Sequence, residues 1–265
     1  MIWMRMINGF TNLCKGLNNN LVFNTLVFQA KINSGLKQVE LFDDILSLGF
    51  NNIEPRREYF VDIDKEIPEM RKAAESKNIT LFYSVPDYIF LDDGELNPKI
   101  FEYFEEAKRL NVANVKMSIG NYRHFSQLKQ LNFINDQPFN FTVENDQTQQ
   151  SGTINKINQF LQDAKKAKLN IGYTFDLGNF RYVQESEVDA ADTLGSYVTY
   201  IHLKNLAEQD GNFIVTSLDK GIIDWKSVVE KLPTGLPIGL EYPSSDVDEV
   251  LRDKQSIEVL ENERK

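Results

Sequence analysis

The chain has 265 residues, 42% of them hydrophobic, and a formal net charge of −10. This acidity argues against nucleic acid as a partner, since nucleic-acid binding depends mainly on Lys and Arg that meet phosphates. No apolar run approaches the ~20 residues that span a bilayer, so no membrane partner is expected. The single cysteine, Cys14, cannot form an intrachain disulfide, which suits a reducing, cytoplasmic location. The length fits one barrel of alternating strands and helices, which commonly has ~250 residues, better than two independent domains.

Residues 1–20 form a segment ahead of the first predicted strand. Its apolar residues are interrupted by Arg5, Asn8, Asn12 and Lys15, so it lacks the continuous apolar region of an export signal. We therefore expect an N-terminal lead-in over residues 1–20 and one domain over residues 21–265.

The first half of the domain alternates between strand-like and helix-like hydrophobic periods. Strands are expected at 21–28, 51–54, 79–85 and 114–119, with the third stopping at Pro86. Helices are expected at 36–48, 67–76, 98–110 and 125–134, the last with a weaker pattern. Pro98 suits an early helical position, where a proline removes no helical hydrogen bond.

The second half repeats this alternation more clearly. Strands are expected at 139–143, 170–175, 198–203 and 237–240, and helices at 153–167, 187–194, 223–232 and from 246 onward. A longer loop is expected between the strand at 198–203 and the helix at 223–232. Strict alternation of short apolar strands with helices predicts a parallel sheet, and eight such units predict its closure. The expected fold class is α/β, a single-domain (β/α)8 TIM barrel.

Four strands of the second half end at a side chain that can bind a metal ion. The segments FNFTVEN, NIGYTFD, VTYIHLK and LPIGLEY carry Glu144, Asp176, His202 and Glu241. The carboxyl ends of barrel strands meet at one mouth, and side-chain alternation allows all four to point inward. Three carboxylates and an imidazole suit one divalent ion: Mn²⁺, Mg²⁺ or Co²⁺ first, with Zn²⁺ a further candidate. The alternative is that the acidic residues cap helices or face solvent and that His202 is a hydrogen-bonded core residue.

The chain resembles the xylose isomerase-like TIM-barrel superfamily, the sugar phosphate isomerase/epimerase group, from about residue 21 to residue 258. The motifs that carry the resemblance are VEN at Glu144, FDLGN at Asp176, YIHLKN around His202, GIIDW at 221–225 and GLEYPSS at Glu241. The resemblance implies that these four residues hold one divalent ion. It also implies that Glu144 and Glu241 are catalytic and move protons, one abstracting and the other returning a proton, on a small-molecule carbohydrate. It further implies a homodimer or homotetramer.

Two positions depart from the family pattern. Asn179 stands where better-known ketose 3-epimerases have a histidine, and Asn205 where many relatives have an aspartate. These differences argue against epimerisation of a free ketose but not against metal binding. Asn179 is a candidate substrate-binding residue. Asn145 and Asp146 either support the neighbouring Glu144 and the substrate or cap the next helix.

Four cations lie near the predicted mouth of this acidic protein. Arg56 and Arg57 follow the strand at 51–54, Lys116 lies in the strand at 114–119, and Lys204 follows His202. Converging cations predict that the substrate carries an anionic group, a phosphate or a carboxylate. The alternative is that the arginines pair with Glu54, Glu58 or Asp62 and that each lysine is solvated or salt-bridged.

The leading prediction is a metal-dependent isomerase or epimerase that acts on a sugar, sugar phosphate or sugar acid through a metal-stabilised enediolate. A lyase is the alternative on the same site, a dehydratase of an inositol- or uronate-derived ketone. A non-catalytic barrel is a third interpretation. A DNA-repair endonuclease of this fold needs several more histidines, and the chain has only His202 and His124, the latter expected to be exposed. A glycoside hydrolase would leave Asp176 and His202 without a role.

Overall fold

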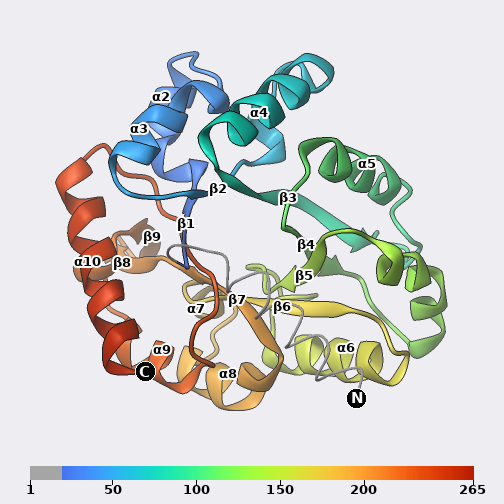
Figure 1. The fold of residues 1–265 in the computed structure, drawn as a ribbon. Helices are drawn as coiled ribbons and strands as arrows, with labels where there is room; N and C mark the ends of the chain where they lie inside the picture. Colours follow the sequence, from blue (N-terminus) through green and yellow to red (C-terminus); the bar gives the residue numbers. More distant parts are fainter. Residues whose placement is uncertain (1–19) are drawn as a thin grey trace.

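Eight parallel strands close into a barrel in the computed structural model, which describes residues 20–265 (Figure 1). The lead-in predicted for residues 1–20 lies almost wholly outside the described residues. The barrel strands are β1 (Leu21–Asn24), β2 (Asn52–Glu54), β3 (Thr80–Phe90), β4 (Asn114–Gly120), β5 (Asn140–Glu144), β6 (Ile171–Asp176), β7 (Val198–Leu203) and β10 (Ile238–Leu240). Closure is made by β1 and β10, where Leu21 pairs with Ile238. The predicted single-domain (β/α)8 TIM barrel is confirmed.

Helices surround the barrel, most of them at the positions that the sequence predicts (Figure 1). They are α2 (Gln29–Asn33), α3 (Phe42–Ser47), α4 (Ile63–Lys77), α5 (Ile100–Leu110), α6 (Ile154–Lys166), α7 (Asn179–Tyr182), α8 (Glu187–Leu194), α9 (Trp225–Lys231) and α10 (Val247–Glu263). In α5, Ile100, Phe104 and Ala107 recur at helical spacing and are buried, so one stripe of the helix packs on the sheet. The helix ends at Asn111, which adopts a left-handed conformation with φ of 58°.

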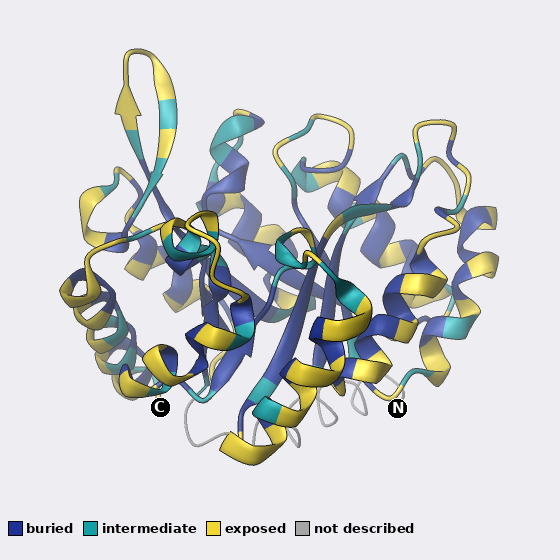
Figure 2. Ribbon diagram, turned by 90° about the horizontal axis from the view of Figure 1, so that it is seen from above, coloured by how far each residue is buried: buried dark blue, intermediate teal, exposed yellow. Residues whose placement is uncertain are grey.

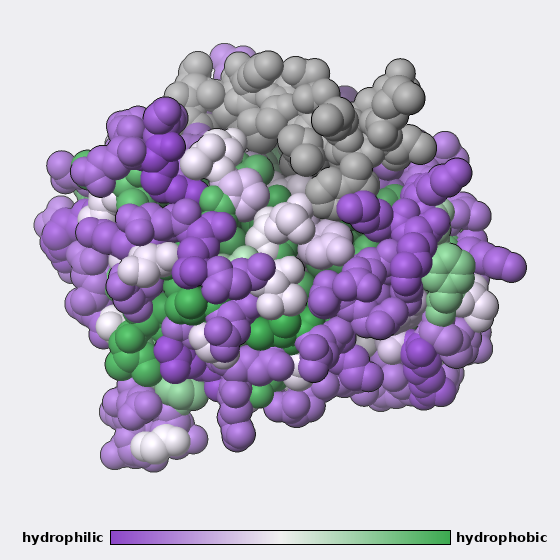
Figure 3. Space-filling model, turned by 90° about the horizontal axis from the view of Figure 1, so that it is seen from below, coloured by the Kyte–Doolittle hydropathy of each residue, from purple (hydrophilic) through white to green (hydrophobic). Residues whose placement is uncertain are grey.

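Buried residues concentrate in the strands and the inner faces of the helices, and exposed ones lie on the outer faces (Figure 2). One side of the molecule is mainly hydrophilic, with small hydrophobic groups between the polar side chains (Figure 3). Inside the barrel, Val22, Phe82 and Tyr200 form a separate apolar cluster, with the rings of Phe82 and Tyr200 5.1 Å apart. No helix within residues 20–265 is both long and apolar enough to cross a membrane.

Three local predictions were wrong. The first strand ends at Asn24, and Thr25–Phe28 forms a 3₁₀ turn because the Asn24 side chain accepts a hydrogen bond from the backbone N–H of Leu26. Strand β3 does not stop at Pro86 but continues to Phe90, with a register shift between Ser84 and Tyr88 that accommodates the proline. The weak helix predicted at 125–134 is a series of 3₁₀ turns, Phe125–Asp136.

The longer loop after β7 contains an antiparallel hairpin, β8 (Asn205–Gln209) and β9 (Asn212–Thr216). Its turn is formed by Asp210 and Gly211, both with positive φ. An Asp-Gly pair is a common signal for such a turn, so the sequence contained the evidence for this hairpin. The hairpin projects beyond the end of the barrel at which the strands finish (Figure 2).

Candidate metal centre

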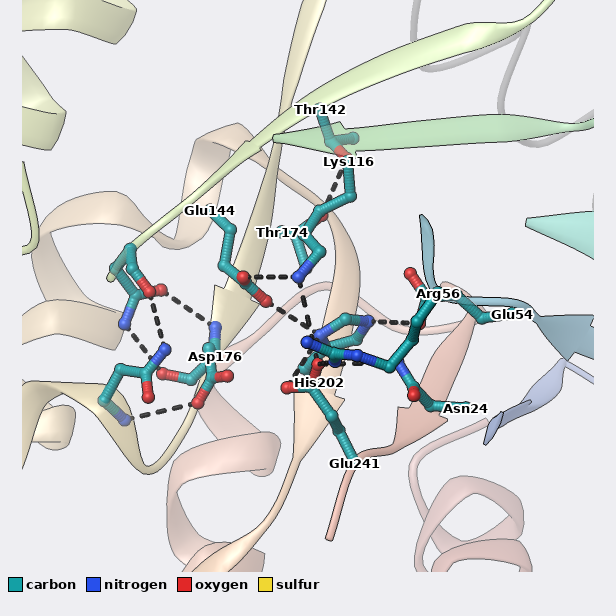
Figure 4. Close-up of polar contacts among 12 residues, drawn as sticks. Asn24, Glu54, Arg56, Lys116, Thr142, Glu144, Thr174, Asp176, His202 and Glu241 are labelled. Atoms are coloured by element: carbon teal, nitrogen blue, oxygen red, sulfur yellow. Dashed lines mark hydrogen bonds and ion pairs between the residues drawn. The ribbon is translucent and has the colours of Figure 1, made fainter. Parts of the chain in front are cut away.

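The four predicted metal ligands meet at the carboxyl ends of their strands (Figure 4). Glu144 and Asp176 are the last residues of β5 and β6, His202 is in β7, and Glu241 directly follows β10. Asp176 pairs in register with His202, which brings the two strand ends level. Each residue is buried, and one ligand atom from each lies within 4.8 Å of the others. The structure therefore brings together residues that the sequence separates by almost 100 positions.

The imidazole of His202 has a defined orientation in this group. Its Nδ1 atom lies 2.8 Å from Oε1 of Glu144 and 3.3 Å from Oε2 of Glu241. Its Nε2 atom lies on the other side of the ring, 2.9 Å from Oε2 of Glu54. Nδ1 is thus the nitrogen that faces the other candidate ligands.

A divalent ion fits this set of side chains. Carboxylate oxygens and one imidazole nitrogen are ligands that Mn²⁺, Co²⁺ and Zn²⁺ accept. The spacing allows all four donors to reach one ion. Buried carboxylates this close to one another repel unless a positive charge offsets them. The cluster could therefore hold one metal ion.

The charged forms of these residues depend on one another. Burial raises the pKa of Asp176 to about 7, although the charge of Lys204 opposes the shift. Burial also acts to raise the pKa of Glu241, but the charges of Lys204 and His202 hold it well below its ordinary value. For His202, burial lowers the pKa, but the charges of Glu54 and Glu241 outweigh burial and raise it well above the ordinary value. A bound cation would favour the ionised carboxylates and the neutral imidazole.

Three of the four predicted cations lie against these carboxylates. Nζ of Lys116 is 2.6 Å from Oε2 of Glu144, and Nζ of Lys204 is 2.6 Å from Oδ2 of Asp176. The guanidinium of Arg56 is 2.6 Å from Oε1 of Glu241. These cations thus offset part of the negative charge of the site.

Arg57 does not reach the mouth. Its guanidinium binds Glu106 through two hydrogen bonds of 2.8 and 2.9 Å and Glu102 through one of 3.0 Å, both on α5. It also stacks 4.6 Å from the ring centroid of Tyr103. The alternative expectation, that Arg57 pairs with acidic side chains and not with substrate, is therefore the better account. Its partners are Glu102 and Glu106 and not Glu54, Glu58 or Asp62.

A cavity of about 560 Å³ opens above the cluster, within the range of small-molecule sites. Glu144 and Glu241 line it, as do Arg56, Lys116 and Lys204. Asp176 and His202 are not among its lining residues and lie behind the two glutamates. Apolar parts of the wall come from Leu26, Val85, Pro86, Val215 and Pro243. The two glutamates are therefore the candidate ligands that a bound molecule would meet directly.

No protein-family model and no curated protein sequence matches the chain. Solved structures match it over nearly the whole length. The IolI protein, solved with a zinc atom, has a TM-score of 0.68 and 13% identity over 92% of this chain and 99% of that one. A probable 3-DHS dehydratase, AsbF of Bacillus anthracis, has a TM-score of 0.67 and 13% identity over 90% of this chain and 98% of that one. An L-ribulose 3-epimerase has a TM-score of 0.68 and 12% identity over 92% of this chain and 95% of that one.

The chain has the xylose isomerase-like TIM-barrel fold. Within this xylose isomerase-like barrel, sequence reasoning missed a layer of polar residues behind His202. Glu54 at the end of β2 is fully buried and accepts hydrogen bonds from Nδ2 of Asn24 at 2.8 Å and from the Tyr200 hydroxyl at 3.0 Å. Glu54 is itself an acidic residue at a strand end, the signal that identified Glu144, Asp176 and Glu241. The sequence alone predicts Glu54 only as a partner for Arg56 or Arg57.

Two asparagines shape the strand ends of this xylose isomerase-like barrel. The Asn145 side chain donates to the backbone carbonyl of Asp176 and accepts from its backbone N–H, both at 2.9 Å. It thereby fixes the backbone of a candidate ligand. Asn179 lines the cavity, donates to the backbone carbonyl of Asn145 at 2.8 Å and accepts from Nε2 of Gln147 at 3.1 Å. Asp146 accepts from Thr148 and shapes the turn.

Gly178 and Asn205 position the segment around Lys204. A Cβ on Gly178 would lie 3.0 Å from Cγ of Lys204, so the turn after β6 packs closely on the lysine stem. Asn205 is fully buried and joins the end of β7 to a later loop, donating to the carbonyls of Leu218 and Ile223. Asn205 therefore has a structural role at the end of β7.

Proposed function

We propose that this protein is a divalent-metal-dependent isomerase or epimerase acting on a sugar, sugar phosphate or sugar acid. The observation that carries the proposal is the placement of Glu144 and Glu241 in the cavity wall, with Asp176 and His202 behind them. A solved L-ribulose 3-epimerase with the same fold supports the reaction class, and the zinc-containing IolI supports the use of a metal.

In this proposal the two glutamates move the proton. A bound divalent ion would stabilise the negative charge that develops on a substrate carbonyl oxygen when the neighbouring carbon loses its proton. One glutamate takes that proton, and the other returns a proton to complete isomerisation or epimerisation. The pKa of Glu241 is well below its ordinary value, although its burial opposes this, so Glu241 is ionised at neutral pH. Asp176 and His202 hold the ion and do not touch the substrate.

The test is exchange of a carbon-bound proton in D₂O. Metal-loaded protein is incubated with ketoses, their phosphates, and inositol- or uronate-derived ketones, and exchange is followed by NMR. We expect Glu144→Gln and Glu241→Gln each to lower the exchange rate by about 10²–10⁴-fold, the usual contribution of a general acid or base. Glu105→Gln, which changes an exposed glutamate of α5, is the control. Full turnover in either folded site variant would contradict the assignment.

A lyase is the second candidate, favoured by the matching fold of a probable 3-DHS dehydratase. The same removal of a proton beside a carbonyl leads to loss of water when a hydroxyl lies β to that carbonyl. Product analysis separates the two. Deuterium incorporation without a dehydrated product supports the isomerase. An unsaturated product that has lost one water relative to the substrate supports the lyase.

A further inference from the structure

Two buried lysines in the cavity share their carboxylate partners with the metal centre. Lys116 is 4% exposed and Lys204 is 7% exposed. Lys116 pairs with Glu144 and lies 3.8 Å from Oε1 of Glu241, and Lys204 pairs with Asp176 and lies 3.2 Å from Oε2 of Glu241. Within residues 20–265, every carboxylate that pairs with either lysine is a candidate metal ligand.

This arrangement makes the lysines and a divalent ion compete for the same oxygens. A buried ammonium without a negative partner is costly, because the protein interior does not replace its hydration. An ion that takes over Glu144, Asp176 and Glu241 therefore leaves both lysines in need of an anion. Arg56 is less dependent on the site, because it also binds Glu58 at 2.6 Å.

The position of the lysines decides where that anion can come from. Both line the same cavity as Glu144 and Glu241, so they are accessible to a bound molecule. The three cations also surround one carboxylate: Arg56 and Lys116 approach Oε1 of Glu241, and Lys204 approaches Oε2. Three positive groups of the cavity wall thus already bind one carboxylate, that of Glu241.

We propose that the substrate carries an anionic group, a phosphate or a carboxylate, that Lys116 and Lys204 bind with help from Arg56, and that this anion and the metal ion bind cooperatively. The ion occupies the carboxylates, and the anion replaces them as the partner of the lysines. The inference rests on the proposed function for the role of the four ligands. By linkage, each partner strengthens the binding of the other by the same factor.

The experiment measures Mn²⁺ affinity, not turnover. The electron paramagnetic resonance signal of free Mn²⁺ is titrated against protein in chloride, sulfate or acetate at one ionic strength, with protein-free titrations correcting for direct ion pairing. We expect sulfate or acetate to tighten Mn²⁺ binding by about tenfold, within the ~5–150-fold range of such couplings. A larger effect of sulfate indicates a phosphate group on the substrate, and a larger effect of acetate indicates a carboxylate.

Variants distinguish an anion site from simple charge balance. Lys116→Gln and Lys204→Gln are expected to lose the anion effect and, in chloride, to bind Mn²⁺ at least as tightly as the native protein, because a competing cation is gone. Lys108→Gln, which changes an exposed lysine of α5 that pairs with Glu105, should behave like the native protein.

Two results overturn the inference, and they differ from failure of the proposed function. Equal Mn²⁺ affinity in all three salts, or an anion effect that survives both lysine substitutions, shows that the lysines only balance charge. In either case the metal centre and its proposed reaction stand. Native protein that binds no Mn²⁺ in any salt overturns the proposed function as well.

Discussion

Glu54 contacts His202 from the side opposite the other candidate ligands: Oε2 of Glu54 is 2.9 Å from Nε2, while Nδ1 faces Glu144 and Glu241. A carboxylate in this position fixes which nitrogen carries the proton and holds the ring in place. Because Asn24 and Tyr200 both donate to the same oxygen of Glu54, the carboxylate is itself held in position.

We predict that Glu54→Gln weakens divalent-metal binding by about 10–100-fold, the usual effect of removing such a support from a ligand. The amide can offer its NH₂ group to Nε2 and so favour the wrong tautomer. Metal affinity is measured by competition with a chromophoric chelator. Glu69→Gln, an exposed position that pairs with Lys37, is the control. Unchanged affinity in folded Glu54→Gln would show that the contact does not support the site.

Metal loading should also stabilise the fold. An ion that binds only the folded chain adds about 2.7 kcal/mol to the free energy of unfolding when its concentration is 100 times Kd. For a chain of this size that corresponds to a rise in Tm of roughly 5–11 °C. Thermal unfolding with and without chelator gives the difference. In Glu144→Gln the increment should shrink, and an identical shift in native protein and variant would argue against Glu144 as a ligand.

Arg57 offers a contrast with its neighbour in the sequence. We expect Arg57→Ala to lower the free energy of unfolding by about 1–3 kcal/mol, because it leaves the buried Glu106 without its charged donor. Metal affinity should stay at the native value, since Arg57 lies away from the mouth. Urea unfolding and metal titration of the same preparation test both parts. Weakened metal binding without loss of stability would place Arg57 in the site after all.

Asn145 links backbone geometry to the metal centre. Asn145→Ala removes both hydrogen bonds to the backbone of Asp176 and the one accepted from the Tyr173 hydroxyl at 2.8 Å. We expect a loss of about 1–3 kcal/mol in stability together with weaker metal binding. Asn155→Ala, at an exposed position of α6, is the control. Should Asn145→Ala lose stability and retain native metal affinity, its role would be confined to the fold.

The barrel and the meeting of the four candidate ligands could be predicted because both follow from local patterns. Each strand is apolar and short, and each of Glu144, Asp176, His202 and Glu241 lies where a strand ends. In a closed parallel barrel those ends share one mouth whatever the details of packing. The places of these four residues at strand ends in the sequence therefore predicted that they lie together in the structure.

What escaped prediction depends on contacts across the barrel or on the direction of a turn. Glu54 and His202 come from β2 and β7, which are not neighbours in the sheet, so no sequence spacing indicates their contact. Arg56 and Arg57 follow the same strand, yet one reaches Glu241 and the other α5. Arg56 is still extended and pairs with Ser84, whereas Arg57 begins the 3₁₀ turn Arg57–Tyr59, which the sequence does not specify.

Among residues 20–265, the strands of the β8–β9 hairpin pair only with each other, and Val215 of β9 contributes to the cavity wall. Changes at its turn, Asp210–Gly211, lie outside the ladder of the eight barrel strands. The outline of the cavity can therefore change while the four candidate ligands keep their positions. Grafting this hairpin onto another barrel of the same fold would measure how far it shapes the cavity.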